Sequence, residues 1–559
     1  MDNFSVFIGG KAGDGVDTSS LIIARILNQL GYRLYIYRDY PSLIRGGHTF
    51  SIIRASENKI ATHLNKVDFL LALNQDCIDL HKNRLKENTI IIYNLDLVKS
   101  ENLPGDKKLL GLPLEKMAKE QNAPAIMHNS CIIGAFCKAV SIPWNILEAV
   151  FRKNISREID LNLKVARLGF EAGKELTGIK TLPQNSLPLL SGNEAIGLGL
   201  IKGGLDTYVA YPMTPSSSLL HFLANVAKGS SLKVIHPESE IGVILMALGF
   251  SYAGEKVAVG TSGGGFCLMT EGLSLAGMAE LPIVILVGQR TGPSTGLPTY
   301  TGQTELHFVL NAGQGEFPRF IVAPGDLEEA YFWSAVALNI SWKYQIPAII
   351  LSDKTLSEGT YSFDIDSVEE INEEKPLIWD RKTAYKRYLN TDTGVSPLTF
   401  VPDKDAIIKV NSYEHDEFGI TTEEAQLTKM MQEKRLRKYK YISEEIVRYK
   451  PVKSYGKKDS PVALLCWGSN KGVCVEAAEN LGLKVIQPLV LSPFPVKQLQ
   501  EALLGVKRLI SVENNATGQL AGLVKFYGFD VNEKILKYDG RPFSLDELEE
   551  ALKDLSVKK

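Results

Sequence analysis

Cysteine is scarce in this chain of 559 residues, and its spacing argues against a cysteine-ligated cluster. No two cysteines follow the CxxC pattern; the six are Cys77, Cys131, Cys137, Cys267, Cys466 and Cys474. Iron–sulfur and zinc sites need thiolates that converge from short, fixed spacings. We therefore expect neither an iron–sulfur cluster nor a metal site on this chain. Cys131 and Cys137 lie in an apolar helical segment, and we interpret them as core residues.

The chain also lacks an excess of charge of one sign, and it lacks a long hydrophobic run. Its formal net charge is −2, which gives no reason to expect a nucleic-acid partner. The longest apolar run, Leu281 to Val287, is too short to cross a bilayer. The N-terminal sequence MDNFSVFIGG has no basic segment of the kind that begins a signal peptide. We therefore expect a cytoplasmic protein without a membrane partner.

Short hydrophobic runs that end in glycine, proline, serine or threonine are the main feature of the sequence. In the central region they cover 207–210, 256–260 and 282–288, and helical patterns lie between them. This alternation predicts parallel strands that are buried on both faces. In such α/β sheets, ligands bind at the carboxyl ends of the strands. We therefore predict a multidomain α/β fold with a site in this region, and the length predicts three or four domains.

Changes of composition divide the chain into four predicted regions: 1–180, 190–360, 361–455 and 456–559. The stretch LPQNSLPLL, with two prolines among polar residues, predicts a linker between the first two regions. The first, second and fourth regions alternate strand and helix patterns. The third is rich in Glu, Lys and Asp, and its charge alternation predicts a solvated connecting helix with irregular flanks.

A glycine-rich turn follows the first predicted strand, Phe4–Ile8. The turn has the sequence GGKAGDGV, and a helical pattern begins after it. Backbone N–H groups at such a turn can face an anion, although Gly13 and Gly15 could also serve only a backbone with positive φ. The turn matches neither a Walker A loop nor the GxGxxG pattern. On its own it is a weak indication of a binding site.

A second candidate for phosphate binding lies in the sequence RDYPSLIRGGHTFSIIRAS. Its arginines, among them Arg45, stand near the turn formed by Gly46 and Gly47. Fork-shaped guanidinium groups suit the recognition of phosphate. His48 follows the two glycines, and we interpret it as a structural hydrogen-bonding residue rather than as a ligand.

A rigid loop, YPMTPSSS, follows the first central strand. Pro212 and Pro215 fix φ on either side of Thr214, and the serines Ser216–Ser218 are suited to cap the next helix. Thr214 is thereby held at the end of a strand, where its hydroxyl group could bind a ligand. A capped turn without a ligand is the alternative interpretation.

Two charged residues of the central region could have either a structural or a catalytic role. Glu240 opens the apolar helical segment IGVILMALGFSYAG, where a carboxylate could cap the helix or be held for chemistry. Arg290 ends the third central strand, where it could bind a small carboxylate or tie its loop to neighbouring carbonyls. We expect Glu271 and Glu280 to cap or pair locally.

Taken together, these motifs resemble the 2-oxoacid:acceptor (ferredoxin or flavodoxin) oxidoreductases. The central motifs resemble the α subunit in order and spacing: YPMTPSSS, ESEIG, TSGGGFCLMTEGLSLAG, GQRTGPSTGLPT and GEFPR. GGKAGDGV followed by YPSLIRGGHTF resembles the γ domain of the family, here fused ahead of α. The last region, which ends in ILKYDGRPFS and a short tail, resembles the transketolase C-terminal-like domain that closes α subunits.

The resemblance implies a fold and a reaction. The fold would be a γ-type α/β domain, a pyrimidine domain of the thiamine diphosphate-binding fold and the C-terminal α/β domain. The reaction would be coenzyme A-dependent oxidative decarboxylation of a 2-oxoacid to acyl-CoA and carbon dioxide, with reduction of ferredoxin. Pyruvate, 2-oxoglutarate, branched-chain and aryl 2-oxoacids all stay open as substrates. A non-catalytic coenzyme A-binding or assembly subunit of a related complex is the alternative.

The resemblance also implies cofactors and partners. Thiamine diphosphate would be shared with a β subunit that supplies the magnesium and diphosphate half of the site. The GDG at Gly13–Gly15 is not a magnesium and diphosphate motif, because no asparagine lies in the required window around Ser42–Arg45. The lack of a complete motif is consistent with a β subunit that supplies this half. Coenzyme A would be a co-substrate, and the iron–sulfur cluster would lie on a partner. We expect an αβ heterodimer or a dimer of such heterodimers.

The resemblance assigns roles to individual residues. Glu240 matches the glutamate that binds the aminopyrimidine N1′ of thiamine diphosphate. Thr214, with Pro212 in the same motif, matches the threonine near the substrate and cofactor. Arg290 matches the arginine that binds the carboxylate of the 2-oxoacid. The implied coenzyme A contacts are Gly13, Gly15, Arg45 and Gly46.

Three positions depart from the family pattern. Met213 replaces an isoleucine, which is a tolerable exchange of apolar side chains. Asp14 stands where the family usually has Gln or Glu, so a direct role for that side chain is in doubt. Gln314 replaces the histidine of GHGEFPR and removes a titratable group there.

Overall fold

Three α/β sheets carry the fold, which confirms the predicted fold class. The computed structural model describes residues 2–41, 46–99, 101, 103, 105 and 108–557. The chain forms two units, one made of 1–190, 359–364 and 543–559 and the other of 191–358 and 365–542. The domain limits predicted within these units stay a prediction. No helix in the described part of the chain has the length and apolar character needed to cross a membrane.

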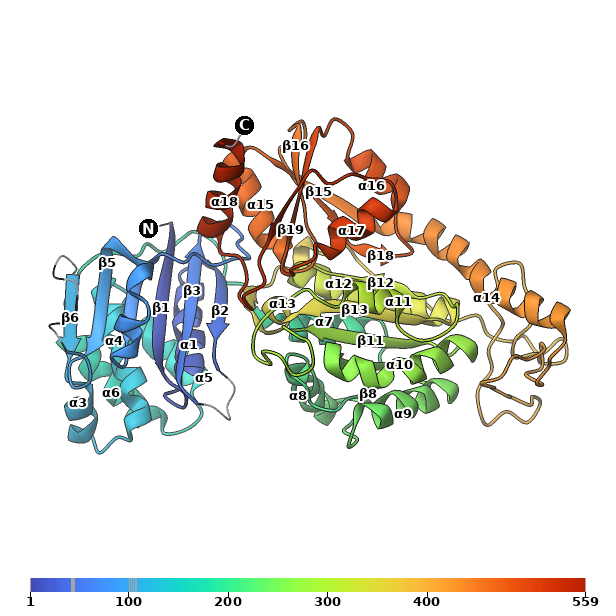
Figure 1. Cartoon of the computed structure of the whole chain (residues 1–559). Helices are drawn as coiled ribbons and strands as arrows, with labels where there is room; N and C mark the ends of the chain where they lie inside the picture. The colour runs from blue at the N-terminus through green and yellow to red at the C-terminus, as the bar shows by residue number, and fades with distance from the viewer. Residues whose placement is uncertain are drawn as a thin grey trace. The chain divides into compact units, whose positions relative to one another are not determined.

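An eight-stranded mixed sheet forms the centre of the first unit, in the order β6-β5-β4-β1-β3-β2-β14-β7 (Figure 1). β1 pairs in parallel with β4 and antiparallel with β3. Phe4 to Gly10 are all buried because helices and loops cover both faces of this central strand. The strands are β1 (Asn3–Lys11), β2 (Arg33–Asp39), β3 (His48–Ser56), β4 (Val67–Ala72), β5 (Leu85–Asn94), β6 (Lys108–Leu112), β7 (Leu189–Ser191) and β14 (Thr360–Ser362).

Two helices of the first unit approach each other closely at glycines. A Cβ atom on Gly134 of α4 would overlap the carbonyl oxygen of Ala166, and one on Gly169 of α6 would overlap that of Cys131. Cys131 and Cys137 are fully buried in this core, as predicted. The helices are α1 (Val16–Gln29), α2 (Asp76–Asp79), α3 (Leu114–Glu120), α4 (His128–Ala139), α5 (Trp144–Asn154), α6 (Ile159–Ala172) and α18 (Leu545–Val557), with short 3-10 helices η1 (Lys82–Arg84) and η3 (Ala125–Met127).

Two late segments of the chain belong to this first unit. β14 pairs antiparallel with β2, and Ser362 Oγ accepts a hydrogen bond from the N–H of Leu34 at 2.9 Å. The N–H of Leu545, the first residue of α18, donates to the carbonyl of His63 at 3.0 Å. Residues 543–557, which we predicted with the last region, therefore belong with the N-terminal sheet. Pairing between residues so far apart in the sequence leaves no local signal.

A seven-stranded sheet, in the order β18-β12-β13-β11-β10-β8-β9, forms the centre of the second unit. All neighbours are parallel except β18, which pairs antiparallel with β12. Every residue of β10, β11 and β13 is buried, as expected of parallel strands covered on both faces. The strands are β8 (Thr207–Val209), β9 (Lys233–Ile235), β10 (Val257–Ser262), β11 (Ile283–Gln289), β12 (Phe320–Val322), β13 (Pro347–Asp353) and β18 (Val490–Ser492).

Helices cover both faces of this sheet. α9 and α10 pack on one face, and α12 lies on the other (Figure 1). Ser191 and Glu194 form a capping box at the start of α7, and the side chain of Asp326 caps α12. The helices are α7 (Gly192–Lys202), α8 (Ser217–Val226), α9 (Glu240–Tyr252), α10 (Gly263–Met278), α11 (Leu306–Asn311), α12 (Leu327–Tyr344) and α13 (Lys354–Glu358), with the 3-10 helix η4 (Ala227–Gly229).

The C-terminal part of the second unit holds a five-stranded sheet in the order β15-β17-β16-β19-β20. The buried carboxylate of Glu513 accepts hydrogen bonds from the N–H groups of Leu520 and Ala521, at the start of α17. The elements are β15 (Val452–Gly456), β16 (Val462–Leu465), β17 (Lys484–Pro488), β19 (Arg508–Glu513), β20 (Glu533–Leu536), α15 (Asn470–Leu481), α16 (Val496–Ala502) and α17 (Gln519–Phe526).

The charged segment before this sheet contains a helix with irregular flanks, as predicted, but one side of that helix is buried rather than solvated. It is irregular from 366 to 424, apart from η5 (Ile365–Ser367), and then forms α14 (Ala425–Glu445) and η6 (Ile446–Tyr449). Lys434 and Lys438 of α14 are fully buried and form ion pairs with Glu280. The prediction that Glu280 pairs locally is therefore wrong, because its partners come from a distant helix.

Candidate functional site

The carboxyl ends of β8, β10 and β11 bring together Thr214 and Arg290. After β8 the chain passes through the loop that contains Pro212, whose ring is exposed, and Thr214, which is half-buried. Arg290 follows β11 directly, and its Nη1 donates to the carbonyl oxygen of Thr214 at 2.9 Å. Ser216 precedes α8, and its hydroxyl donates to the carbonyl of Met213 rather than capping the helix. The two sequence-predicted residues therefore meet at the predicted edge of the sheet.

Glu240 is buried at the start of α9. The hydroxyl of Ser239 caps this helix by accepting from the N–H of Gly242, so Glu240 is not needed as the cap. Only 4% of Glu240 is exposed, and its Oε1 atom has no hydrogen-bond partner among the described residues. A buried carboxylate oxygen without a partner is costly. Glu240 is therefore suited to accept a hydrogen bond from a ligand.

Glycines at the start of α10 make room for this carboxylate. A Cβ atom on Gly265 would lie 2.6 Å from Oε1 of Glu240 and would overlap the hydroxyl of Thr261. A Cβ atom on Gly260 would likewise overlap the hydroxyl of Tyr208. Neither hydroxyl group has a hydrogen-bond partner within the described residues. Several unsatisfied polar atoms thus gather at this edge of the sheet, as expected of a site for a polar ligand.

Arg290 has the charge that a small carboxylate would need. The side chain is half-buried, and burial lowers the pKa of the guanidinium group while Glu305 opposes that shift. The guanidinium group nevertheless stays protonated at neutral pH, because the ordinary pKa of arginine lies far above neutrality. The loop that follows folds back on itself, since the N–H of Leu297 donates to the carbonyl of Thr291 at 2.9 Å. Arg290 thus ties its loop to Thr214 and also carries a charge into the site.

Glu305 is a residue of this site that sequence reasoning missed. It follows the loop TGPSTGLPTYTGQT, and burial raises the pKa of its carboxyl group to about 7, with hydrogen bonds from Thr304 opposing the shift. A Cβ atom on Gly263 would lie 2.6 Å from its Oε1 atom. Its sequence context gave no signal beyond a position shortly after the glycine- and proline-rich loop.

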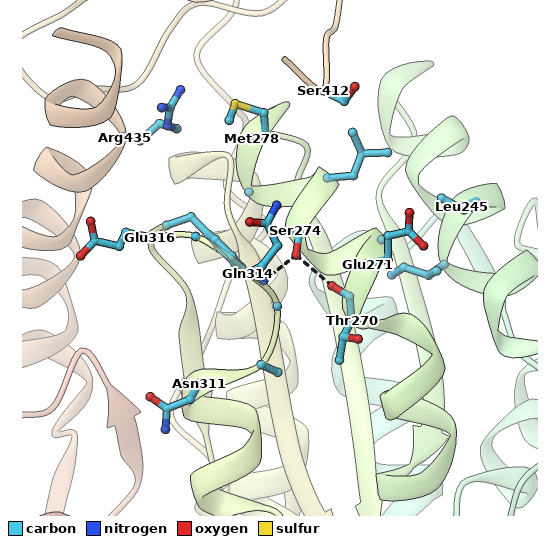
Figure 2. A pocket seen from close by; sticks show the side chains of 18 of the residues that line it. Leu245, Thr270, Glu271, Ser274, Met278, Asn311, Gln314, Glu316, Ser412 and Arg435 are labelled. Carbon is cyan, nitrogen blue, oxygen red and sulfur yellow. Dashed lines mark hydrogen bonds between the residues drawn. The ribbon is translucent and has the colours of Figure 1, made fainter. Parts of the chain in front are cut away.

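A groove of about 900 Å³ lies on the outer side of α9 and α10 (Figure 2). The backbone N–H of Gln314 donates to the hydroxyl of Ser274 at 2.9 Å, and that hydroxyl donates to the carbonyl of Thr270 at 3.0 Å. Arg319 of the motif GEFPR is buried and donates to the carbonyls of Val309 and Ala312. Arg319 therefore holds the loop in place. Neither the groove nor this loop includes the residues predicted for catalysis.

The exposed sides of α9 and α10 carry several large apolar side chains beside the charged Glu271. Ile241, Leu245 and Leu268 each expose about half of their surface, and Met246 exposes 41%. Large apolar side chains that gather on one face of a soluble protein indicate a surface for another protein. Ile241, Leu245 and Leu268 also line the groove of Figure 2.

The predicted coenzyme A contacts lie in the first unit, except Arg45, which lies outside the described residues. Gly13 and Gly15 have φ of 99° and 71°, and Gly46 has φ of 61°. The N–H of Ala12 donates to the carbonyl of Gly47 at 2.8 Å, so the two glycine turns meet. The left-handed φ of Gly15 at the start of α1 explains why glycine is used there.

Polar side chains support these two turns. The carboxylate of Asp14 accepts from the N–H of Lys11 at 2.7 Å, which gives this side chain a structural role. The Nε2 atoms of His48 and His81 lie 3.0 Å apart, and Nε of Arg84 donates to Nδ1 of His81 at 3.2 Å. His48 is therefore hydrogen-bonded to another protein side chain, in agreement with the structural interpretation.

Family models match two parts of the chain. A model described as pyruvate flavodoxin/ferredoxin oxidoreductase, thiamine diphosphate-binding, matches residues 198–463. A second, described as pyruvate ferredoxin/flavodoxin oxidoreductase, matches residues 5–172. The second unit thus contains most of a thiamine diphosphate-binding domain, and the first unit matches the other model.

Full-length relatives are similar to the chain over nearly all of it. A 2-oxoacid:ferredoxin oxidoreductase subunit alpha of Saccharolobus solfataricus is 32% identical, with 99% of this chain and 98% of that protein covered. The 2-oxoglutarate oxidoreductase subunit KorA of Mycobacterium tuberculosis is 26% identical, with 98% and 91% covered. Among solved structures, the 2-oxoglutarate:ferredoxin oxidoreductase from Magnetococcus marinus, with 2-oxoglutarate, coenzyme A and succinyl-CoA bound, has a TM-score of 0.90 at 27% identity, with 99% of each chain covered.

Proposed function

Because this chain belongs to the family of 2-oxoacid:ferredoxin oxidoreductase alpha subunits, we propose that it is the γ/α subunit of a coenzyme A-dependent enzyme of this family. The complex would convert a 2-oxoacid and coenzyme A to acyl-CoA and carbon dioxide, with reduction of ferredoxin. The observation that carries the proposal is the buried Oε1 of Glu240, which has no hydrogen-bond partner among the described residues and lies at the sheet edge where Arg290 meets Thr214.

The residues of the sheet edge fit thiamine diphosphate. When bound, this cofactor supplies a carbon nucleophile and a sink for the electrons released by decarboxylation. Glu240 would hold a proton between its Oε1 and N1′ of the aminopyrimidine, which satisfies the carboxylate and promotes the acid–base step carried by the cofactor. Thr214 and Pro212 would line the site beside the cofactor and the substrate.

Arg290 would bind the carboxylate of the 2-oxoacid. Its guanidinium group is already oriented by the carbonyl of Thr214, so little freedom is lost when a carboxylate binds beside it. Its half-buried position strengthens the attraction, since fewer water molecules screen the charge. Because Thr214 also accepts the hydrogen bond from Arg290, its hydroxyl group would orient the same substrate.

A β subunit would complete the site at the exposed apolar sides of α9 and α10. Glu240 is the first residue of α9 and lies at the edge of that apolar surface. A partner that covers Ile241 and Leu245 would exclude water from the carboxylate of Glu240. The partner would also supply the magnesium and diphosphate half of the site, as well as the iron–sulfur cluster. We therefore expect the isolated chain to be inactive.

The first unit would bind coenzyme A at the two glycine turns. The positive φ of Gly13, Gly15 and Gly46 leaves backbone N–H groups without the shielding of a side chain. Arg45 would add a guanidinium group for a phosphate. Replacement of Arg45 by alanine is expected to raise the KM for coenzyme A and to leave the KM for the 2-oxoacid unchanged.

Replacement of Glu240 by glutamine tests the proposal. In the complex purified with its β subunit, coenzyme A-dependent reduction of a viologen dye is measured across a panel of 2-oxoacids. We expect E240Q to lower kcat by about 100- to 10,000-fold, because the cofactor loses its proton-holding partner. Thiamine diphosphate binding, measured by calorimetry, should weaken as well.

Glu238 provides the matched control, because it is exposed and lies two residues before Glu240. E238Q should retain the activity and cofactor binding of the wild type. An E240Q complex as active as E238Q would refute the assignment. A complex in which R290A leaves turnover and KM unchanged would instead favour a non-catalytic assembly subunit.

A further inference from the structure

Glu305 is a carboxyl group of the candidate site to which the proposed mechanism gives no role. Its Oε1 atom accepts a hydrogen bond from the hydroxyl of Thr304 at 2.8 Å. Its Oε2 atom is buried and has no hydrogen-bond partner in the described part of the chain. The backbone N–H of Glu305 donates to the side chain of Gln289 at 3.1 Å, which fixes the residue beside the end of β11. Such an oxygen requires either a proton of its own or a ligand beside it.

The carboxyl group of Glu305 packs against the same helix turn as that of Glu240. Gly263, the first residue of α10, leaves room for Glu305, and Gly265 leaves room for Glu240. Both carboxyl groups have one buried oxygen without a partner among the residues that the structure describes. The glycine run at the start of α10 therefore holds two carboxyl groups at one edge of the sheet. This places Glu305 within the proposed site for cofactor and substrate.

Arg290 is the cation whose charge acts on the carboxyl group of Glu305, and the backbone of Glu305 is held by the side chain of Gln289, the residue before Arg290. Each side chain influences the other: Arg290 opposes the increase in the pKa of Glu305, and Glu305 opposes the decrease in that of Arg290. No ion pair joins the two among the described residues, because the guanidinium group donates to the carbonyl of Thr214. Two other polar groups lie on the elements that surround Glu305. They are the carboxyl group of Glu240, on α9, and the side-chain amide of Gln289, on β11.

His307 is a further titratable group close to Glu305 in the sequence. It lies in α11, and its side chain and backbone N–H contact Gln519 of α17 rather than Glu305. A substitution at His307 therefore offers a control near the site, because it leaves Glu305 and Arg290 unchanged.

We propose that Glu305 controls the availability of Arg290: as an uncharged acid it leaves the guanidinium group free to bind the substrate carboxylate, and as a carboxylate it competes with the substrate. This inference rests on the proposed role of Arg290. If both Glu305 and the substrate were ionised, two carboxylates would share one guanidinium group. Substrate binding therefore favours the uptake of one proton from solvent by Glu305.

The direction of the pH dependence follows from this linkage. Burial raises the pKa of Glu305 to about 7, so the free enzyme holds the proton below that pH and loses it above. Substrate binding is therefore strongest at low pH and weakens as the pH rises. For one group, we expect binding to be about tenfold weaker at about pH 8 than at about pH 6. The carboxylates of 2-oxoacids are fully ionised throughout this range and add no titration of their own.

Calorimetry on the complete complex with its β subunit tests the inference. Two ligands are used that cannot be decarboxylated: glutarate, which has the two carboxylates of 2-oxoglutarate, and oxamate, which has the size of pyruvate. Titrations in two buffers of different ionisation enthalpy give the number of protons taken up on binding. Near pH 8 the wild type should take up a proton when the ligand binds. Its affinity for the ligand should be about tenfold lower at about pH 8 than at about pH 6. The KM for the preferred 2-oxoacid should change in the same way.

Replacement of Glu305 by glutamine keeps the shape and the bond from Thr304 but removes the titration. E305Q should bind the ligands without proton uptake and with an affinity that is independent of pH, whereas H307Q should behave as the wild type. An E305Q complex that still shows the wild-type pH dependence overturns the inference. So does a wild-type complex that takes up no proton, a result that does not depend on how well the variant folds.

Arg290→Ala separates this inference from the proposed function. If R290A binds the ligands and the 2-oxoacid as the wild type does, the proposed role of Arg290 fails, and the inference fails with it. If R290A weakens binding while E305Q titrates like the wild type, only the inference fails. Loss of binding in R290A together with a flat pH profile in E305Q supports both.

Discussion

Replacement of Glu280 by glutamine is a test of how α14 is held on the second unit. The carboxylate of Glu280 accepts a hydrogen bond from Nζ of Lys434 at 2.7 Å and another from Nζ of Lys438. The guanidinium group of Arg387 donates to the backbone carbonyl of Glu280 at 2.8 Å. These four residues are all buried. Glu280 is therefore the acidic member of a buried cluster with three cations.

The expected cost of E280Q follows from the charges that it leaves behind. Without the carboxylate, the ammonium groups of Lys434 and Lys438 stay buried with no counter-charge in the cluster. Removing one partner of a buried ion pair typically costs about 3–5 kcal/mol of unfolding free energy. Replacement of Lys438 by methionine should cost much less, because the pair of Glu280 and Lys434 remains and the new side chain is apolar.

The cluster also gives the stability of this region a pH dependence with a definite sign. Burial lowers the pKa of Lys438 to about 7, although Glu280 opposes that shift. An unfolded lysine titrates at about 10.4, so between about pH 7 and pH 10 the unfolded chain binds more protons than the folded one. The contribution of Lys438 therefore becomes more favourable as the pH rises through this window. In K438M that rise should be smaller.

Hydrogen exchange of the amides of α14 is the suitable assay, because global unfolding of a chain with two units is not a two-state process. The matched control is Glu433, which pairs with Lys429 on the exposed side of the same helix. E433Q should change the opening free energy of α14 by no more than about 0.5 kcal/mol. Equal protection in E280Q and E433Q would refute the assignment of the cluster as the anchor of α14.

Two further predictions concern glycines that allow close approach. Gly265→Ala should leave the chain folded but lower the turnover of the complex, because the new methyl group would displace the carboxylate of Glu240; in Gly264→Ala, the control, the nearest atom would be 3.8 Å away. Gly169→Ala should lower the thermal stability of the first unit by about 1–3 kcal/mol, because the methyl group would force α6 away from α4. Gly178→Ala, whose methyl group would meet no atom within 4 Å among the described residues, is its control in calorimetric unfolding.

The positions of the central strands could be predicted from the sequence because their signals are local. The hydrophobic runs at 207–210, 256–260 and 282–288 correspond to β8, β10 and β11, with ends that differ by one or two residues. Glycine, proline and hydroxyl side chains follow each run because the chain must turn there. The rule that ligands bind at the carboxyl ends of parallel strands then placed Thr214 and Arg290 near each other, and a hydrogen bond joins these residues.

The partners of buried charges could not be predicted in the same way. Glu280 pairs with lysines that lie 154 and 158 positions later in the chain. The charge pattern around Lys434 and Lys438 is also typical of an exposed helix, since acidic and basic side chains alternate along it. Periodicity tells which residues share a side of the helix, but it does not tell whether that side faces water. Only the tertiary fold decides this question.

The glycine run at the start of α10 combines both cases. A glycine costs a helix about 1 kcal/mol relative to alanine, so three of them in the first turn conflict with the helical pattern that follows. A residue whose local preference conflicts with the fold often indicates a functional site. The glycines of TSGGGF, which disfavour a helix but begin one, are such residues. The glycine run does not tell which side chains approach the helix. Glu240 precedes α10 in the sequence and Glu305 follows it. The glycines therefore mark the site, whereas the identity of its two carboxyl groups depends on the packing of α9 and of the loop before α11.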